Sequence, residues 1–208
     1  MRLQAKDRET GFSAIELVIV VAIIMILVGF TVFQTKSTTN NSRANAAMGN
    51  VVTQLRQARQ MAITMRRNVL VSFTPPNQMQ IVVQTLPGEA PAPVFKPILL
   101  NDGAPGGLQF YVFPTIKDTP MNFGNSQAIN FVTSTGGTSG LSVMFSTSGS
   151  FVGTTATTNF AAVGNNNQIN ASIFVGIPGA QNTARAITVL GGTGRVRSFY
   201  WDGTNWNE

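Results

Sequence analysis

The side chains that most enzymes use for acid–base and nucleophilic chemistry are scarce in this sequence. Its 208 residues include no histidine, no cysteine and only 8 carboxylates. The commonest general base, the usual zinc ligands and the thiol nucleophile are therefore missing. No two carboxylates have a spacing suited to acid–base catalysis, and no serine or lysine has a visible catalytic partner. We therefore expect a protein that is not an enzyme and that holds no cofactor and no metal.

Two arginines near the C-terminal end indicate a different chemistry. In RVRSFYW, residues 195–201, strand alternation would place Arg195 and Arg197 on one face together with Phe199 and Trp201. Guanidinium groups bind phosphate and aromatic rings stack on bases, so Arg195, Arg197 and Trp201 are candidate contacts to DNA. The alternative is structural, with arginine stacked on Trp201 and the aromatic rings closing the core.

The charge balance agrees with an anionic partner but does not identify it. The chain has 14 Lys and Arg against 8 Asp and Glu, a formal net charge of +6. Nucleic acid, lipid headgroups and acidic protein surfaces would all be attracted. Four further arginines, at positions 56, 59, 66 and 67, are interpreted more simply as the solvated face of a helix near its C-terminal end.

Three short motifs resemble ligand-binding loops without the required context. GGTG, residues 191–194, lies between two strand-like segments rather than between a strand and a helix, so we predict a hairpin turn and not a phosphate loop. The segments 101–103 and 202–203 contain Asp-Gly pairs but too few neighbouring oxygens for calcium, so turns are predicted there also.

Glu16 stands at the edge of a long apolar run. Residues 17–33 carry no charge, and with residues 12–15 the run reaches about 20 residues, enough for a helix to cross a bilayer. The basic residues of the preceding segment, Arg2, Lys6 and Arg8, predict that the N-terminus faces the cytoplasm and the rest of the chain the exterior. A cleaved secretory signal is the alternative, but no A-x-A pattern follows the run. In a simple anchor, Glu16 would have an insertion cost unless it reached a partner or the headgroups.

Gly11, Phe12 and Glu16, with the short basic head and the apolar run, resemble the prepilin signal of type IV pilins and type II secretion pseudopilins. The resemblance implies that a prepilin peptidase cleaves after Gly11, that Phe12 is N-methylated, and that the apolar run is retained. Ser13-Ala14 departs from the commoner Thr-Leu. Glu16 would then be an assembly residue, pairing with the terminal ammonium of Phe12 in a neighbouring subunit inside a fibre.

The elements that follow are a second helical stretch and then strands. Apolar residues recur at steps of three and four residues from Met48 to Met65, which predicts one face of an amphipathic helix. A helix from Phe12 to about Arg67, frayed at the polar STTNNS, would be about 80 Å long. From Asn68 the pattern changes to short alternating runs separated by turns. Strands are predicted at 68–73, 80–85, 108–113, 128–133, 141–145, 171–176, 184–190 and 195–201.

These patterns predict an α+β fold in which a long N-terminal helix packs on a mostly antiparallel sheet. The predicted divisions are a leader at 1–11, a transmembrane helix half at 12–35, an amphipathic half at 36–67 and a periplasmic β-rich domain at 68–208. Segments 55–73 and 184–203 resemble the GspH/FimT branch of the pilin-like proteins, and the chain is identified as a member of that branch by resemblance alone.

The resemblance implies a minor pilin or pseudopilin that assembles through its N-terminal helix into a type II secretion pseudopilus or a type IV pilus tip. Its partners would be the inner membrane, other pilins or pseudopilins and the prepilin peptidase. It would sit in the inner membrane as a single-pass protein and enter an extracytoplasmic fibre. The alternatives are a pilus-displayed subunit that binds DNA through the GRVR strand, and a monotopic domain that never polymerises.

Overall fold

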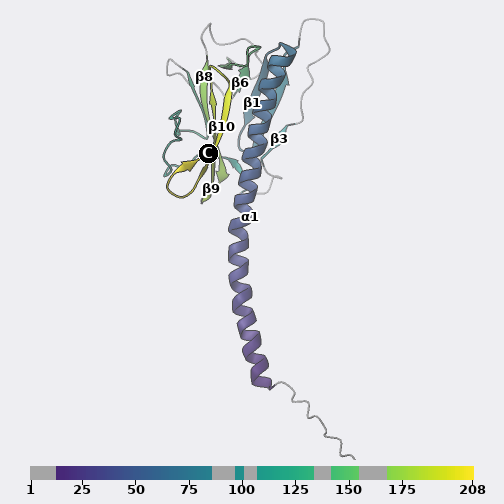
Figure 1. Ribbon diagram of the computed structural model, residues 1–208, viewed down its shortest axis with the longest axis vertical. Helices are drawn as coiled ribbons and strands as arrows, with labels where there is room; N and C mark the ends of the chain where they lie inside the picture. Colours follow the sequence, from purple (N-terminus) through teal and green to yellow (C-terminus); the bar gives the residue numbers. More distant parts are fainter. Residues whose placement is uncertain (1–12, 86–96, 101–106, 134–141, 155–167) are drawn as a thin grey trace, which may run out of the picture. The chain divides into compact units, whose positions relative to one another are not determined.

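The computed structural model describes residues 13–85, 97–100, 107–133, 142–154 and 168–208, with only the backbone of residues 30–37. It divides into two compact units, Met1–Thr39 and Asn40–Glu208. The longest element is the helix α1, Ala14–Met65, drawn in purple and blue in Figure 1. The predicted leader, residues 1–11, and Phe12 lie outside the described residues.

Helix α1 is continuous where the sequence suggested fraying. The STTNNS stretch, residues 37–42, remains helical. In the Asn40–Glu208 unit the helix buries one stripe of small and aliphatic side chains, spaced three and four residues apart as the periodicity predicted. Met65, predicted on this face, is 50% exposed because the helix ends there. The buried members of the stripe are Ala44, Ala47, Val51, Val52, Leu55, Ala58 and Ala62.

The first sheet has five strands in the order β3-β2-β1-β6-β7. Its centre is the predicted hairpin, β1 at Val69–Thr74 and β2 at Gln78–Val83, paired antiparallel around the Pro75-Pro76 turn. Strand β1 has a nearly continuous buried run because both its neighbours are strands and the helix covers it. The edge strands are β3 (Ile98–Leu99) and β7 (Phe151–Gly153), and β6 (Ser142–Phe145) lies between β1 and β7.

The second sheet has six strands, and its long members are β8 (Ile169–Ile177), β9 (Ala180–Leu190) and β10 (Arg195–Trp201). All three pair antiparallel, and β8 carries a bulge between Val175 and Ile177. The short strand β11, Trp206–Asn207, pairs with β10. The free edge of β8 is shared by two further strands, β4 at Gln109–Phe110 and β5 at Ile129–Thr133.

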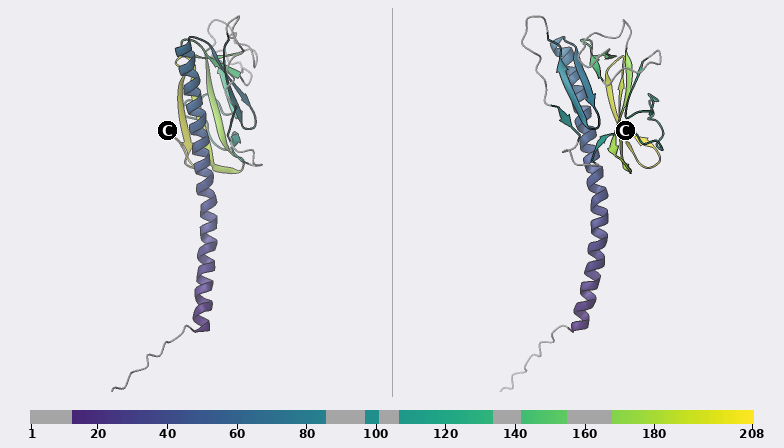
Figure 2. Two further views of the ribbon diagram at one scale, coloured as in Figure 1. Left: turned by 90° about the vertical axis from the view of Figure 1, so that its right-hand side faces the viewer. Right: turned by 180° about the vertical axis from the view of Figure 1, so that it is seen from behind.

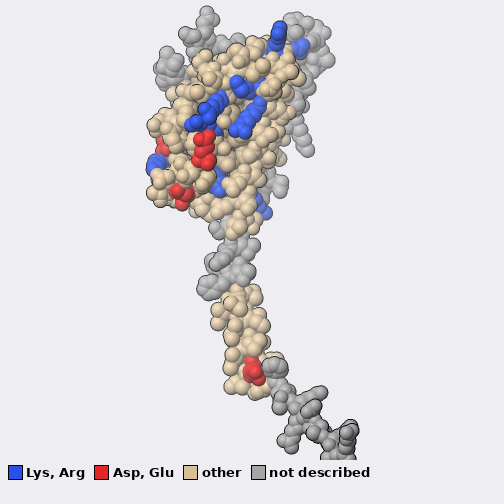
Figure 3. All heavy atoms as spheres, in the orientation of Figure 1, with Lys and Arg blue, Asp and Glu red and all other residues tan. Residues whose placement is uncertain are grey.

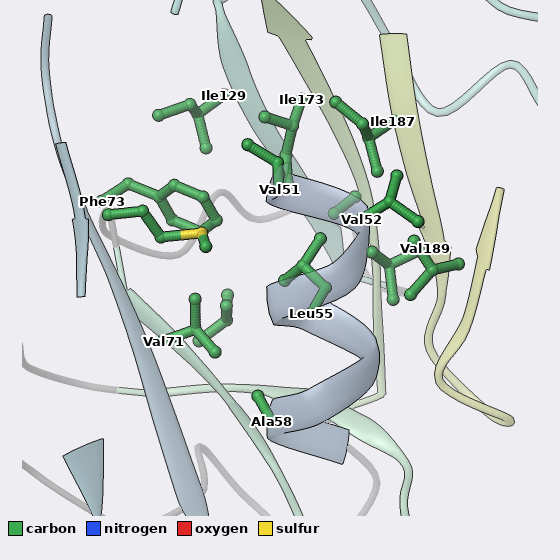
Figure 4. Packing of buried hydrophobic residues seen from close by; sticks show 14 of the residues in the cluster. Val51, Val52, Leu55, Ala58, Val71, Phe73, Ile129, Ile173, Ile187 and Val189 are labelled. Atoms are coloured by element: carbon green, nitrogen blue, oxygen red, sulfur yellow. The ribbon is translucent and has the colours of Figure 1, made fainter. Parts of the chain in front are cut away.

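The main core joins both sheets to the helix. Strands of both sheets lie alongside the Asn40–Met65 part of α1 in the two views of Figure 2. Figure 4 shows Leu55 between Val71 of β1 and Val189 of β9, all three fully buried. Each such aliphatic side chain contributes about 1.5–3 kcal/mol on burial. The α+β prediction is therefore confirmed at the level of a helix packed on antiparallel sheets, although the described strands form two sheets and not one.

A second apolar cluster covers the opposite face of the second sheet. Phe174, Ala186 and Phe199 contribute from β8, β9 and β10. The irregular segment 111–125 covers them with Phe113 and Ile116. A strand was predicted at 108–113, just before and at the start of this segment. Of those residues, only Gln109 and Phe110 form a strand, β4, which pairs with β8. Apolar clusters therefore lie on both faces of the second sheet.

Candidate functional site

The prepilin-like residues are only partly covered by the structure. Gly11 and Phe12, the predicted processing residues, lie outside the described residues. Glu16 lies in the first turn of α1 and is exposed. The Ser13 carbonyl oxygen accepts hydrogen bonds from the backbone N–H groups of Glu16 (3.0 Å) and Leu17 (3.2 Å). Ser13 is thus the N-cap, and the order Ser-x-x-Glu is that of a capping box. The Ser-x-x-Glu order is visible in the sequence but was not used there to predict the start of the helix.

The first part of α1 exposes apolar side chains on all sides. From Ile15 to Val28, the exposed fractions of the large aliphatic residues run from 42% at Val21 to 70% at Ile15 and Met25. Among the described residues, no helical stretch combines the length and hydropathy of a membrane span. The predicted span, residues 12–33, includes residue 12 and the side chains of 30–33, which lie outside the described part.

Strand β10 alternates as the sequence predicted. It pairs with β9 so that Arg195, Arg197 and Phe199 stand opposite Leu190, Thr188 and Ala186. Phe199 belongs to the outer cluster, whereas Val196 belongs to the main core, so Arg197 and Phe199 start from the sheet face opposite the helix. Arg195, the first residue of the strand, lines hollows on both sides of it.

The aromatic residues of this strand serve the core more than the surface. Phe199 is 4% exposed and cannot stack on a base without leaving the cluster. Trp201 is half-buried, and its ring lies 5.4 Å from that of Trp206 at 64°. Trp206 donates from Nε1 to the Lys117 carbonyl oxygen at 2.8 Å. Among the described residues, the ring contact of Trp201 is with Trp206 and none is with an arginine. A role of Trp201 in DNA contact stays a prediction.

The two arginines of β10 have different surroundings. Arg197 is half-exposed, with Nε 3.6 Å from the Glu208 carboxylate and Nη1 3.8 Å from the Met121 sulfur. Arg195 is exposed, and its backbone N–H donates to the Thr193 hydroxyl at 3.3 Å. A small hollow of about 150 Å³ lies between the two side chains, beside Met121, Thr188 and Leu190.

Arg195 also borders a larger open groove of about 570 Å³, which was not predicted from the sequence. Two helix arginines contribute to it, Arg56 and Arg59, which had been interpreted as part of a solvated face. Arg56 donates from Nη2 to the Val196 carbonyl oxygen at 3.4 Å, and Arg59 from Nε to that of Gly149 at 3.2 Å. The only sequence signal was their i, i+3 spacing, which puts both on one helix face. The lining residues are Arg56, Arg59, Gln60, Thr193, Gly194, Arg195 and Val196.

Figure 3 shows lysine and arginine side chains gathered on the visible face of the Asn40–Glu208 unit, with a few acidic side chains beside them. In the part of the chain that the structure describes, the one ion pair within 4.0 Å is that of Arg197 with Glu208. Arg56, Arg59 and Arg195 therefore line one groove, and no carboxylate of the described residues lies within ion-pair distance of them.

The GGTG segment is a hairpin turn, as predicted. Gly194 has φ of 61°, and its N–H donates to the Leu190 carbonyl oxygen at 2.7 Å. A Cβ at Gly194 would overlap the carbonyl oxygen of Gly149, the same oxygen that accepts the hydrogen bond from Arg59. The absence of a side chain at Gly194 thus lets the hairpin, the β6–β7 turn and the helix approach each other, which forms one end of the groove.

Asp202 also has the predicted turn role. Its carboxylate accepts hydrogen bonds at 2.7 Å each from the backbone N–H groups of Thr204 and Asn205 and from the Asn207 side chain. The amide of Asn205 and the other two donors hold the pKa of Asp202 below its usual range. The described residues contain no group of three or more potential metal ligands. The similar segment 101–103 lies outside them.

Comparison with known proteins identifies no family. No protein-family model matches the chain, and no curated protein matches its sequence. Two solved structures of the minor pseudopilin EpsH from the type 2 secretion system of Vibrio cholerae are similar in fold, each with 11% sequence identity. One has a TM-score of 0.45 and covers 78% of this chain and 99% of that chain. The other has a TM-score of 0.43 and covers 81% and 97%.

Proposed function

We propose that this chain is a structural minor subunit of an extracytoplasmic fibre, either a type II secretion pseudopilus or a type IV pilus tip. Cleavage after Gly11 and N-methylation of Phe12 produce the mature subunit. The apolar half of its helix, residues 12–35, holds it in the inner membrane before assembly, with the C-terminal domain in the periplasm. The same helix half then packs against other subunits in the fibre.

The observation that carries this proposal is the exposed apolar surface from Ile15 to Val28. Covering one such aliphatic side chain contributes about 1.5–3 kcal/mol, so water is an unfavourable environment for the whole segment. Lipid and the helices of neighbouring subunits both provide a suitable apolar cover. A single acidic residue, Glu16, interrupts this surface, and it has no ion pair within the described residues. It is therefore available to a cation on another subunit.

Processing and packing can be tested together because the chain has no cysteine. The full-length protein would be expressed with a prepilin peptidase and pilus or pseudopilus assembly components. Intact-mass measurement should then show loss of residues 1–11 and one added methyl group. Single substitutions Val20→Cys and Ile24→Cys should give disulfide-linked dimers in the membrane or fibre, since both side chains are exposed.

The matched control is Met65→Cys, which is equally exposed but lies at the other end of α1. It should cross-link weakly, because our proposal places subunit packing at the apolar half. Retention of residues 1–11 would contradict the processing step. Absence of cross-links at both apolar positions would support the monotopic alternative and contradict assembly through the helix.

A second candidate function is DNA binding on a fibre, and it is favoured by one observation: Arg195 and Arg197 lie on the same face of β10 and at least Arg195 is exposed. Arg195→Gln with Arg197→Gln should weaken DNA binding by the full-length protein in an uncharged detergent and flatten its dependence on salt. Binding curves unchanged by both substitutions would exclude this site. The fibre role would remain, since it depends on the N-terminal helix.

A further inference from the structure

We propose that Arg56, Arg59 and Arg195 form a binding groove for phosphate groups. The site lies between α1 and the β9–β10 hairpin and is distinct from the Arg197 side of the strand. Phosphate binding does not depend on the fibre role. A subunit that failed to bind phosphate would still assemble through its apolar helix, and a subunit that failed to assemble would still bind phosphate.

The first argument is the convergence of positive charge. Arg56 and Arg59 are separated by one helical turn, and Arg195 approaches from a strand far away in the sequence. Like charges that share a groove repel one another, and this cost persists unless an anion enters. Within the described residues no carboxylate lies within ion-pair distance of these three side chains. The groove therefore has a charge that the rest of the described chain does not neutralise.

The second argument is that the helix arginines are held in place. Arg59 donates from Nε to the Gly149 carbonyl oxygen, and among the described residues its two terminal Nη groups have no partner. Within the described part of the chain, Arg56 donates from Nη2 to the Val196 carbonyl oxygen and from no other nitrogen. Anchored guanidinium groups lose less conformational entropy on binding than free surface arginines do. Two glycines, Gly149 and Gly194, make this anchoring possible because a side chain at Gly194 would overlap the Gly149 carbonyl.

The third argument concerns the shape and charge of the ligand. Three guanidinium groups offer more N–H donors than the two oxygens of one carboxylate can accept. A phosphate monoester carries about −1.5 to −2 charges and three acceptor oxygens, and arginine binds it through paired N–H groups. The Thr193 hydroxyl at the groove is exposed and provides a further donor. The groove is open to solvent, so the phosphate can belong to a larger molecule, such as a nucleic-acid backbone, or be free.

Calorimetric titration of the full-length protein, in an uncharged detergent at low salt, would test the groove. The probes are inorganic phosphate, pyrophosphate and a short DNA duplex of mixed sequence. Arg56→Gln with Arg59→Gln should weaken phosphate and pyrophosphate binding about tenfold or more, the usual effect of losing charge-assisted hydrogen bonds. Arg195→Gln should have a similar effect, and it removes no side-chain hydrogen bond found in the structure. It therefore keeps the test valid if the double variant folds poorly.

The matched control is Arg43→Gln, which removes one positive charge from the same helix at an exposed position outside the groove. It should leave phosphate binding unchanged. Duplex binding that is lost in the same groove variants would identify nucleic-acid backbone as the source of the phosphate, whereas binding of the small anions alone would identify a free phosphate group. Either result supports the groove.

Three outcomes would overturn the proposal. The first is no detectable binding of any phosphate probe by the unaltered protein. The second is equal weakening by Arg43→Gln and by the groove variants, because net charge alone would then explain the binding. The third is tighter binding of a glutamate polymer than of phosphate probes of similar charge, since the groove would then accept an acidic protein surface.

Discussion

Arg185 shows at the level of one residue how the chain keeps a charge in its interior. It is 4% exposed, and its guanidinium donates to the Asn45 side-chain oxygen at 2.7 Å and to the carbonyl oxygens of Asn182 and Ala184 at 2.9 Å each. Burial lowers the pKa of Arg185 from its ordinary value, but arginine remains charged at neutral pH. These neutral acceptors replace part of the lost hydration and tie strand β9 to the helix at Asn45.

Asp202 gives a prediction for pH at the same scale. Its folded pKa is lowered by hydrogen bonds to the carboxylate, so its contribution to stability is present above the unfolded pKa, about 4, and is lost as pH falls through the folded value. Denaturant unfolding of the full-length protein and of Asp202→Asn should therefore differ most at neutral pH, with the unaltered protein more stable. The difference should vanish in strong acid. A difference in unfolding free energy that stays constant from neutral pH to pH of about 2 would contradict this linkage.

The elements differ in how much of them could be predicted. Strand β10 was predicted with its observed bounds, because Gly194 precedes it and its side chains alternate. Strands β3, β7 and β11 have two or three residues each, too few to produce a period. They exist because longer neighbours offer unpaired edges, which is a tertiary effect.

The candidate site also combines features that could be predicted from the sequence with features that depend on tertiary contacts. The shared face of Arg195 and Arg197 follows from the two-residue period of a strand, so it was predictable. The groove depends on Arg56 of α1 contacting Val196 across 140 residues of sequence, and no local pattern contains that information. Gly194 was recognised only as a turn residue, although its second role is to let the helix and the β6–β7 turn come close.

Gly194→Ala tests this second role at the level of elements. The substitution should reduce stability by about 2 kcal/mol or more, from the positive φ together with overlap with the Gly149 carbonyl. Gly179→Ala is the matched control, because Gly179 also has a positive φ, 81°, but open space around its Cβ position. Denaturant unfolding should show a larger loss for Gly194→Ala. Equal losses would mean that backbone conformation alone explains the glycine.

At the scale of the whole molecule, the two compact units differ in the chemistry of their surfaces. The described part of Met1–Thr39 is apolar and exposed, with Glu16 as its acidic residue. The Asn40–Glu208 unit has its own core and a basic surface groove. Each surface calls for a different kind of partner: an apolar one for the helix, as in our fibre proposal, and an anionic one for the groove. A subunit of this kind can be anchored through one unit while the other unit remains open to ligands.

Substitutions of Glu16 can distinguish a role in fibre assembly from a purely local role in capping α1. Ser13 caps α1, and a glutamate or a glutamine at the third helical position can complete the capping box. If capping is its only role, Glu16→Gln should assemble normally and Glu16→Ala should do so slightly less well. If instead Glu16 neutralises the Phe12 ammonium of a neighbouring subunit in an apolar environment, both substitutions leave that ammonium unpaired. The loss for each subunit contact would be about 3–5 kcal/mol, so the fibre yield should fall at least about tenfold in both variants. Quantifying sheared fibres against the membrane-retained subunit would measure this, and wild-type yield from Glu16→Gln would refute the pairing.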